Sequence, residues 1–332
     1  MGVMHYDADL GPLEGRRIAV LGYGAQGHAH ALNLRDSGFD VRVGLYEGSP
    51  SWARAEADGL RVMTAEAACA EADVIALMVP DERIPALFEA AIAPRLSAGK
   101  ALVFAHGFAV QYGQIAPPAD VDVILAAPMG QGNAVRRLFT EGGGMPCLVA
   151  VQQDASSKAL PLALAYAKGL GAHRAGILET TFKEETETDL FAEQVVLVGG
   201  VNALIKASFE TLVEAGYQPE VAYFCSLHEL KAVIDVLQRE GLAGQRRLIS
   251  NTAEYGADRV GPRLIDAHVR QQMKAVLAEI QDGSFARAWI AESAKGCPSL
   301  VAERAAEDAH PIEEVGSRLR SMMPWLSGVK GT

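Results

Sequence analysis

Short apolar runs alternate with stretches of helical periodicity through the first half of the chain. These runs are rich in β-branched and small residues and form the predicted strands, at residues 18–21, 41–45, 74–79, 101–105, 123–127 and 147–151. Such an alternation is typical of a parallel sheet that is covered by helices on both faces. The pattern therefore predicts a doubly wound α/β fold for this half.

The pattern changes after about Thr181. From residue 184 to residue 325, apolar residues recur at spacings of three and four, and β-branched runs are few. Glycine and proline fall where helices are predicted to end, at Gly216, Pro219, Gly241 and Gly261. We therefore expect two domains, an α/β domain over residues 1–181 and an all-α domain over residues 182–327.

The first predicted strand leads directly into a glycine-rich turn, Gly22-Tyr23-Gly24-Ala25-Gln26-Gly27, and then into a helix. Gly22 permits a tight turn, Gly24 lets the backbone approach a pyrophosphate, and Gly27 allows the helix to pack closely on the strand. The phosphates would meet unpaired N–H groups and the positive end of the helix dipole. Because a strand precedes the turn and a helix follows it, we expect a Rossmann-type dinucleotide site rather than an empty structural turn.

Charge and cysteine usage narrow the class of partner. A formal net charge of −11 argues against nucleic acid or an anionic membrane, because those surfaces bind clustered Lys and Arg. The four cysteines are far apart, so neither a zinc site nor a disulfide framework is expected. No apolar run approaches the roughly 20 residues that span a bilayer. We expect a cytoplasmic protein that acts on a small molecule.

The helix after the glycine turn, His-Ala-His-Ala-Leu-Asn-Leu-Arg-Asp-Ser-Gly at residues 28–38, resembles that of the ketol-acid reductoisomerase family. The resemblance extends from residues 6–10 to residues 322–326, and the length suits the short form of the family. It implies NAD(P)H and Mg²⁺ as cofactors and a role in branched-chain amino-acid synthesis. It also implies a knotted helical domain and a dimer or higher oligomer with shared active sites.

Two acidic segments of the helical half are similar to the metal-binding segments of that family. Asp189 and Glu193 are four residues apart, which places both carboxylates on one helical face. By themselves they also fit a solvated acidic face, but Mg²⁺ prefers such oxygen ligands. In the family the Asp bridges two ions and the Glu holds one. Glu229, in the segment His228-Glu229-Leu230-Lys231, matches a carboxylate of the second ion.

Two positions depart from the family pattern. Cys225 stands where the family has a Glu, and a thiol is a poor substitute for a carboxylate on Mg²⁺. Met129 stands where the family has its catalytic Lys, in a segment in which Gln131 and Asn133 also replace family residues. A methionine cannot supply the fixed charge of a lysine. We therefore expect the site to hold as few as one ion.

Two further catalytic positions retain the family residue. His106 would lie near the nicotinamide, and Ser250 would contact the substrate. The resemblance also implies that Cys225, Glu229 and Ser250 face Asp189 and Glu193 of the other subunit.

The loop after the second predicted strand bears on the choice of nicotinamide. Tyr46 takes the place of a family Arg, and Glu47 could accept from ribose hydroxyls and repel a 2′-phosphate. Ser49 and Ser51 could still donate to that phosphate. The balance slightly favours NADH over NADPH. The full set of cofactor-binding candidates is Gly22, Tyr23, Gly24, Ala25, Gln26, Gly27, Tyr46, Glu47, Ser49, Ser51, Asp81, His106 and Gly132.

The family reaction has two parts, a metal-promoted alkyl shift in a 2-hydroxy-2-alkyl-3-oxo acid and hydride delivery to the resulting 2-oxo acid. Loss of a lysine and a metal ligand should impair the shift more than the hydride transfer. The leading hypothesis is thus an NAD(P)H-dependent reductase of a small 2-oxo or imino acid.

The alternative is a working ketol-acid reductoisomerase that converts 2-acetolactate to 2,3-dihydroxyisovalerate, with compensating ligands such as water or Glu185. A second alternative is a catalytically silent dinucleotide-binding protein.

Overall fold

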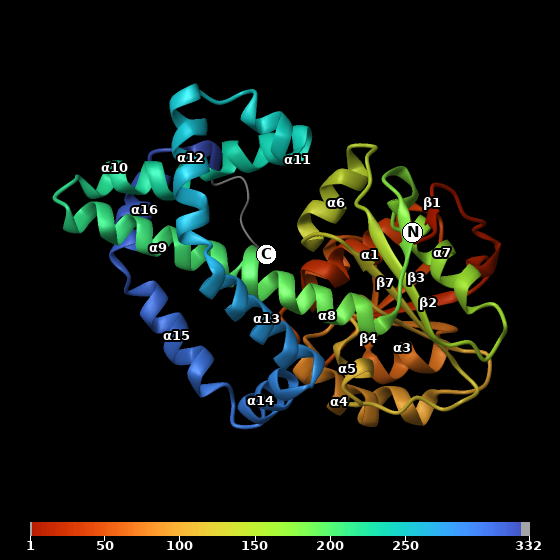
Figure 1. The fold of residues 1–332 in the computed structure, drawn as a ribbon. Helices are drawn as coiled ribbons and strands as arrows, with labels where there is room; N and C mark the ends of the chain where they lie inside the picture. Colours follow the sequence, from red (N-terminus) through yellow and green to blue (C-terminus); the bar gives the residue numbers. More distant parts are fainter. Residues whose placement is uncertain (1, 327–332) are drawn as a thin grey trace. The chain divides into compact units, whose positions relative to one another are not determined.

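The structure is a computed structural model that describes residues 2–326. The chain divides into two compact units, and the first ends at Thr188 while the second begins at Asp189. The division falls inside one continuous helix, α8 (Phe182–Ala192). Figure 1 shows the strands and helices of each unit along the chain. The predicted domain limit at residue 327 lies outside the described residues, and the boundary at residue 181 stays a prediction.

The first unit is built on a nine-stranded sheet in the order β1-β9-β8-β7-β6-β5-β2-β3-β4. The strands are β1 (Met4–His5), β2 (Arg17–Leu21), β3 (Asp40–Leu45), β4 (Arg61–Thr64), β5 (Val74–Leu77), β6 (Ala101–Phe104), β7 (Asp122–Pro128), β8 (Cys147–Gln153) and β9 (Ile177–Glu179). All six predicted strands are confirmed, within a residue or two at their ends. The sequence pattern missed β1, β4 and β9, which are too short to show an apolar run of their own.

The expectation of a wholly parallel sheet is wrong at one side. Strands β2 to β7 are parallel to one another, but β8 runs antiparallel to β7, and β1 runs antiparallel to β9. The end of β7 at Pro128 pairs with the start of β8 at Cys147. Helix α6 (Gly132–Thr140) lies between them in sequence, so the chain turns back without crossing the sheet. Without a crossover, β8 has to run the opposite way.

Helices cover both faces of this sheet. Residues of α1 (Ala25–Asp36), α2 (Trp52–Ala57) and α7 (Ala159–Gly169) pack in the core on one face. Residues of α3 (Ala65–Glu71), α4 (Ile84–Leu87), the π-helical segment η3 (Phe88–Ile92) and α5 (Phe108–Gln111) pack in the core on the other. Shorter 3₁₀ turns are η1 (Gly11–Leu13), η2 (Asp81–Arg83), η4 (Ala93–Arg95) and η5 (Ala172–Arg174). The predicted doubly wound architecture is confirmed.

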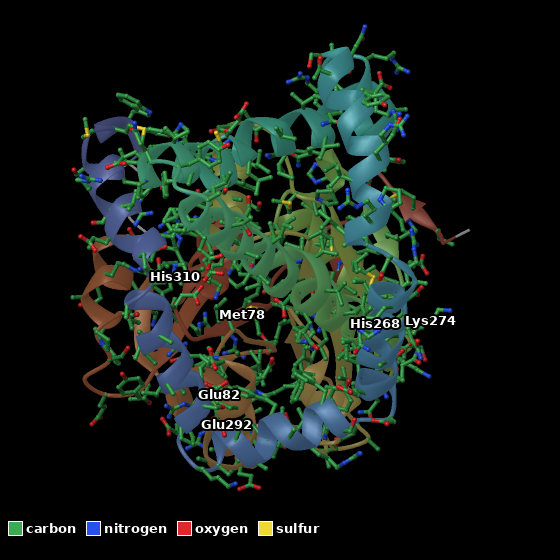
Figure 2. All side chains as sticks on the ribbon, turned by 60° about the vertical axis from the view of Figure 1, so that its left-hand side comes forward. Met78, Glu82, His268, Lys274, Glu292 and His310 are labelled. Atoms are coloured by element: carbon green, nitrogen blue, oxygen red, sulfur yellow. The ribbon has the colours of Figure 1, made fainter. Side chains whose placement is uncertain are left out.

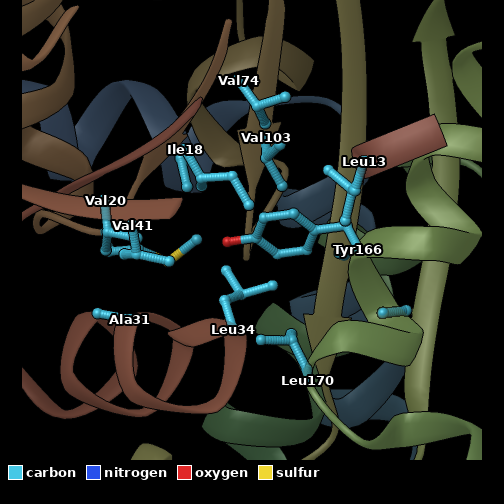
Figure 3. Packing of buried hydrophobic residues seen from close by; sticks show 14 of the residues in the cluster. Leu13, Ile18, Val20, Ala31, Leu34, Val41, Val74, Val103, Tyr166 and Leu170 are labelled. Carbon is cyan, nitrogen blue, oxygen red and sulfur yellow. The ribbon is translucent and has the colours of Figure 1, made fainter. Parts of the chain in front are cut away.

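A buried polar pair lies within the first of these cores. The hydroxyl of Tyr166, on α7, lies 3.0 Å from Nδ1 of His30, on α1, and both side chains are fully buried. Figure 3 shows Tyr166 among Leu13, Leu34 and Val103. Burial disfavours the imidazolium cation and lowers the pKa of His30 to about 3. His30 is therefore a neutral structural residue at physiological pH.

The second unit is helical throughout its described residues, as predicted. Its helices are α9 (Gly199–Glu214), α10 (Pro219–Tyr223), α11 (Leu230–Arg246), α12 (Asn251–Leu264), α13 (Ala267–Gln281), α14 (Ser284–Ser293), α15 (Pro298–Asp308) and α16 (Pro311–Ser321), with the 3₁₀ turn η8 (Pro324–Leu326). Gly216 and Pro219 do mark helix ends. Gly241 instead marks a kink inside α11, with φ of +69°, and Gly261 lies inside α12, so that predicted end is wrong.

The core of the second unit is small. Phe209, Ala222, Tyr223, Ile312 and Leu319 form its buried cluster, in which α9, α10 and α16 meet. His310, labelled in Figure 2, begins α16 and joins it to α9 through Nε2, 3.0 Å from Glu210 Oε1. Many large apolar side chains of the unit remain exposed, including Val196, Leu197 and Val198. Much apolar side-chain surface of the described residues of this unit is therefore accessible in a single chain.

One helical stretch, Phe182–Glu214, is long and apolar enough to cross a membrane when judged by length and composition alone. This finding corrects the expectation that no run approaches that length. The stretch comprises α8, the π-helical segment η6 (Glu193–Leu197) and α9. Only 6% of its most apolar window is buried in a single chain.

Replacing Tyr166 by Phe should test the buried pair. The substitution leaves Nδ1 of His30 without its partner in a fully buried position, so we expect the free energy of unfolding to fall by about 1–3 kcal/mol. Denaturant unfolding of the variant and the parent protein measures the difference. An unchanged midpoint would show that the Tyr166 hydroxyl contributes nothing to stability.

Candidate functional site

The candidate cofactor residues of the first unit lie at one edge of its sheet. Strands β2, β3, β5, β6 and β7 are parallel, so their carboxyl ends share that edge. The residues that follow those ends include Gly22 after β2, Tyr46 after β3, Asp81 after β5, His106 after β6 and Met129 after β7. From β2 the chain builds the sheet outward in one direction, through β3 to β4. It then returns to the other side of β2 and builds outward in the opposite direction, through β5 and β6 to β7. The order of the strands therefore reverses between β2 and β5. Ligands of doubly wound folds bind at that point.

The glycine turn has the geometry that a pyrophosphate requires. Gly22 has φ of +98°, and a Cβ there would lie 2.7 Å from the carbonyl oxygen of Met78. A Cβ on Gly27 would lie 2.3 Å from the carbonyl oxygen of Gly22, so α1 packs directly on the turn. A Cβ on Gly24 would meet no described atom within 4 Å. Gly24 therefore faces open space at the start of α1, where phosphate oxygens can approach the backbone.

A second helix begins at the same place. A Cβ on Gly132, the first residue of α6, would lie 2.0 Å from the carbonyl oxygen of Ala25, the first residue of α1. Within residues 2–326, no side chain caps the amino end of either helix. Gln26 joins them by donating from Nε2 to the carbonyl oxygen of Gly130, 2.9 Å away. Two positive helix ends thus converge beside Gly24, and this arrangement fits a dinucleotide diphosphate.

His106 is held by a buried glutamate. Its Nδ1 lies 3.0 Å from Oε1 of Glu185, whose side chain is 3% exposed. The other carboxylate oxygen accepts from the backbone N–H of Gly107 at 2.9 Å and from the hydroxyl of Thr186 at 3.3 Å. The contact with Glu185 holds Nδ1 of His106 and so fixes the orientation of the imidazole ring. Sequence reasoning named Glu185 only as a substitute ligand and missed this role, although its place near the start of an acidic helix was visible.

The acidic residues of α8 continue from Glu185. Asp189 follows it by one helical turn, so both carboxylates lie on the same face of α8. His106, Glu185 and Asp189 together offer ligand atoms within 4.8 Å of one another, the one such group found among residues 2–326. Glu193 follows Asp189 by four residues and opens η6, a π-helical segment. Such segments often occur at functional sites. The donor set is carboxylate-rich and suits a hard cation such as Mg²⁺.

The second predicted metal segment also contains a π-helical turn, η7 (Phe224–His228). Cys225 lies in this turn and is exposed, and Glu229 follows it directly and is exposed as well. Ser250 caps the amino end of α12, and its Oγ accepts from the N–H of Ala253 at 3.2 Å. Within one described chain, Glu229 belongs to no group of potential ligands with Asp189. Whether these segments meet across two subunits stays a prediction.

The lysine-replacing methionine lies at the carboxyl edge of the sheet. Met129 directly follows β7, is 49% exposed, and donates its N–H to the carbonyl oxygen of Pro146. Gln131 and Asn133 flank the start of α6 and are exposed. The loop residues Tyr46 and Glu47 are exposed, whereas Ser49 is buried and its Oγ accepts from the N–H of Ser51 at 3.3 Å. Ser49 is therefore part of the loop's own structure.

Known proteins match both halves of the chain. Residues 12–176 match the family model of the acetohydroxy acid isomeroreductase NADPH-binding domain, and residues 182–325 match that of the ketol-acid reductoisomerase C-terminal domain. A ketol-acid reductoisomerase (NADP(+)) of Saccharopolyspora erythraea is 58% identical over 319 residues, which are 96% of each chain.

Solved structures agree. An NADH-preferring ketol-acid reductoisomerase from an uncultured archean is 45% identical, with a TM-score of 0.95 over 97% of this chain and 99% of that one. A semialdehyde dehydrogenase NAD-binding protein of Cupriavidus necator, 20% identical with a TM-score of 0.62 over 80% of this chain and 99% of that one, shares the fold alone. This chain therefore belongs to the ketol-acid reductoisomerase family and is an NAD(P)H-dependent oxidoreductase of that family.

Proposed function

We propose that this protein converts 2-acetolactate to 2,3-dihydroxyisovalerate with NAD(P)H and Mg²⁺, a step of branched-chain amino-acid synthesis in the cytoplasm. The observation that carries the proposal is 58% identity to a ketol-acid reductoisomerase over 96% of both chains. It favours the working enzyme over the leading hypothesis from the sequence, in which the alkyl shift is impaired. The diphosphate cradle of α1 and α6 and the group of His106, Glu185 and Asp189 support it.

The proposed reaction has two balanced steps. In the first, a methyl group migrates with its electron pair from C2 to C3, the C2 hydroxyl loses its proton to become a carbonyl, and the C3 oxygen gains one. In the second, C2 receives a hydride and its oxygen receives a proton. Bound Mg²⁺ would supply Lewis-acid stabilisation of the oxygens that gain negative charge. Asp189, Glu193 and Glu229 are the carboxylates that would hold it.

The described residues of the first unit serve the second step. The amino ends of α1 and α6 anchor the diphosphate, which fixes the distance from the cofactor's far end to His106. Glu185 fixes the ring orientation of His106 through its contact with Nδ1, and His106 follows β6 at the same edge of the sheet as Met129. His106 can thus hold or donate a proton at the reacting oxygen.

A second candidate is favoured by Met129 and Cys225. Met129 lacks the positive charge of the family lysine, and Cys225 lacks the carboxylate oxygens of the family glutamate. One fixed electrostatic group in an active site contributes about 10²–10³-fold in rate. A protein without both could reduce the 2-oxo acid 3-hydroxy-3-methyl-2-oxobutanoate yet fail to form it from 2-acetolactate.

Oxidation of NADH and NADPH with each of the two acids distinguishes these functions. A working reductoisomerase oxidises the cofactor with both acids, and its turnover of 2-acetolactate requires Mg²⁺. Oxidation with the 2-oxo acid alone would contradict the main proposal and support the reductase. Oxidation with neither, despite cofactor binding, would support a silent binding protein.

The double substitution Met129→Lys and Cys225→Glu restores both family residues and tests whether their loss impairs the alkyl shift. If compensating ligands already support the shift, we expect less than about a threefold change in kcat for 2-acetolactate. If the shift is impaired, the same variant should gain at least about tenfold with 2-acetolactate and little with the 2-oxo acid. Met322→Lys, at another exposed methionine, is the control for the added lysine.

We also infer a slight preference for NADH, based on Tyr46 and Glu47. Both are exposed on the loop between β3 and α2, where a carboxylate would repel a 2′-phosphate. Replacing Glu47 by Gln should lower KM for NADPH by about threefold to tenfold and leave KM for NADH nearly unchanged. Glu66→Gln, an exposed glutamate on α3, is the control. An unchanged or higher KM for NADPH would show that Glu47 does not determine the preference for NADH over NADPH.

We further infer that a second copy of this chain covers the apolar surface of the second unit. Val196, Leu197 and Val198 are consecutive and each is more than half exposed. We expect light scattering to give at least twice the mass of one chain, and Leu197→Glu to dissociate the assembly and abolish turnover. Val3→Glu, at an exposed valine of the first unit, is the control. A fully active monomer, or association with lipid vesicles, would contradict this inference.

A further inference from the structure

Tyr23, in the glycine turn, is bound by residues of the helix that follows the loop at residues 46–51. Tyr23 is 2% exposed, and its hydroxyl donates to Oδ2 of Asp58 at 2.8 Å. The guanidinium of Arg54 lies over its ring, 5.0 Å from the centroid, and donates to its backbone carbonyl oxygen. Both ends of Tyr23, the ring hydroxyl and the backbone, are therefore bound to the same partner element.

That partner element is α2. Arg54 lies within it and Asp58 caps its carboxyl end, and a spacing of four residues places both side chains on one helical face. The helix begins at Trp52, directly after the loop at residues 46–51 that contains the candidates for recognition of the ribose. The same loop is fixed at its other end by β3, which ends at Leu45.

Helix α1 supports the same cluster from the other side. His28 packs edge-on against the Tyr23 ring, with ring centres 5.3 Å apart, and its Nε2 lies 3.7 Å from Oδ2 of Asp58. Arg35 donates to the backbone carbonyl oxygen of Asp58. Tyr23, Arg54 and Asp58, here called the Tyr23 clamp, thus join the pyrophosphate turn, the loop helix and α1.

We propose that the Tyr23 clamp sets the spacing between the pyrophosphate turn and the loop at residues 46–51, so that both can bind one dinucleotide at once. The three side chains are positioning residues, because they act on the two binding segments through α2. Two linked subsites bind a dinucleotide far better than either binds its fragment only if their spacing matches the ligand. The proposal rests on NAD(P)H binding at this turn and is independent of the alkyl shift.

The test uses Tyr23→Phe, which removes only the hydroxyl, and Asp58→Asn, which removes the charge and keeps the shape. Binding of NADH and NADPH is followed by fluorescence, and binding of adenosine and of inorganic pyrophosphate is followed by NMR. We expect each variant to bind both dinucleotides about tenfold more weakly, with KM raised to match and kcat at saturating cofactor unchanged. Affinities for adenosine and for pyrophosphate should stay within about twofold of the parent values.

Tyr166→Phe is the matched control, because it removes a buried tyrosine hydroxyl on α7 whose partner is His30 on α1. It should lower stability without weakening dinucleotide binding. Unchanged dinucleotide binding in both clamp variants would overturn the proposal, as would a parallel loss of affinity for the separate fragments. Parent protein that binds both dinucleotides but turns over no acid would refute the proposed function while leaving the clamp fully testable.

Discussion

The close approach of α1 to the turn after β2 is the constraint on which the rest of the site depends. A side chain at Gly27 would collide with the carbonyl oxygen of Gly22, and a side chain at Gly132 would collide with that of Ala25. Only glycine at these positions lets two helix ends and one strand end meet at a single point. The backbone N–H groups at the amino ends of α1 and α6, which no described side chain caps, favour a doubly charged diphosphate. A larger residue at either position would push the helix away from the turn, and the N–H groups would no longer point to one place.

Anchoring the diphosphate at one point fixes where the rest of the cofactor can reach. The carboxyl ends of β3 and β6 lie on opposite sides of β2 in the strand order, so in the proposed function one end of a bound dinucleotide would point to Tyr46 and Glu47 and the other to His106. Glu185 is bound to both His106 and the backbone of Gly107, so the ring cannot turn away without breaking a buried carboxylate contact. In the proposed function, hydride transfer would thus depend on these elements of the first unit, whereas Met129 and Cys225 would affect the metal-dependent step.

Much of this site could be predicted from sequence because its determinants are local. A strand, three glycines and a helix in one run specify the turn, and parallel strands place His106 and Met129 at the same edge. The reversed direction of β8 was not predictable from apolar runs, because those runs do not encode on which edge the connecting helix lies. The contacts of Glu185 with His106, and of Arg54 and Asp58 with Tyr23, join residues that are distant in sequence. The spacing of residues along the chain therefore could not predict these contacts. The two π-helical turns, η6 and η7, depend on how the helices pack. The spacing of apolar residues in the sequence does not reveal such a local change in helix type.

A crystal structure with the nicotinamide cofactor and excess Mg²⁺ tests the central claim most directly. The account predicts that the pyrophosphate lies against the backbone of Gly24 and Ala25 at the amino ends of α1 and α6. It also predicts that Nε2 of His106 faces the nicotinamide ring and that Asp189 coordinates Mg²⁺. A pyrophosphate bound elsewhere, with the N–H groups of that cradle facing only water, would contradict the account.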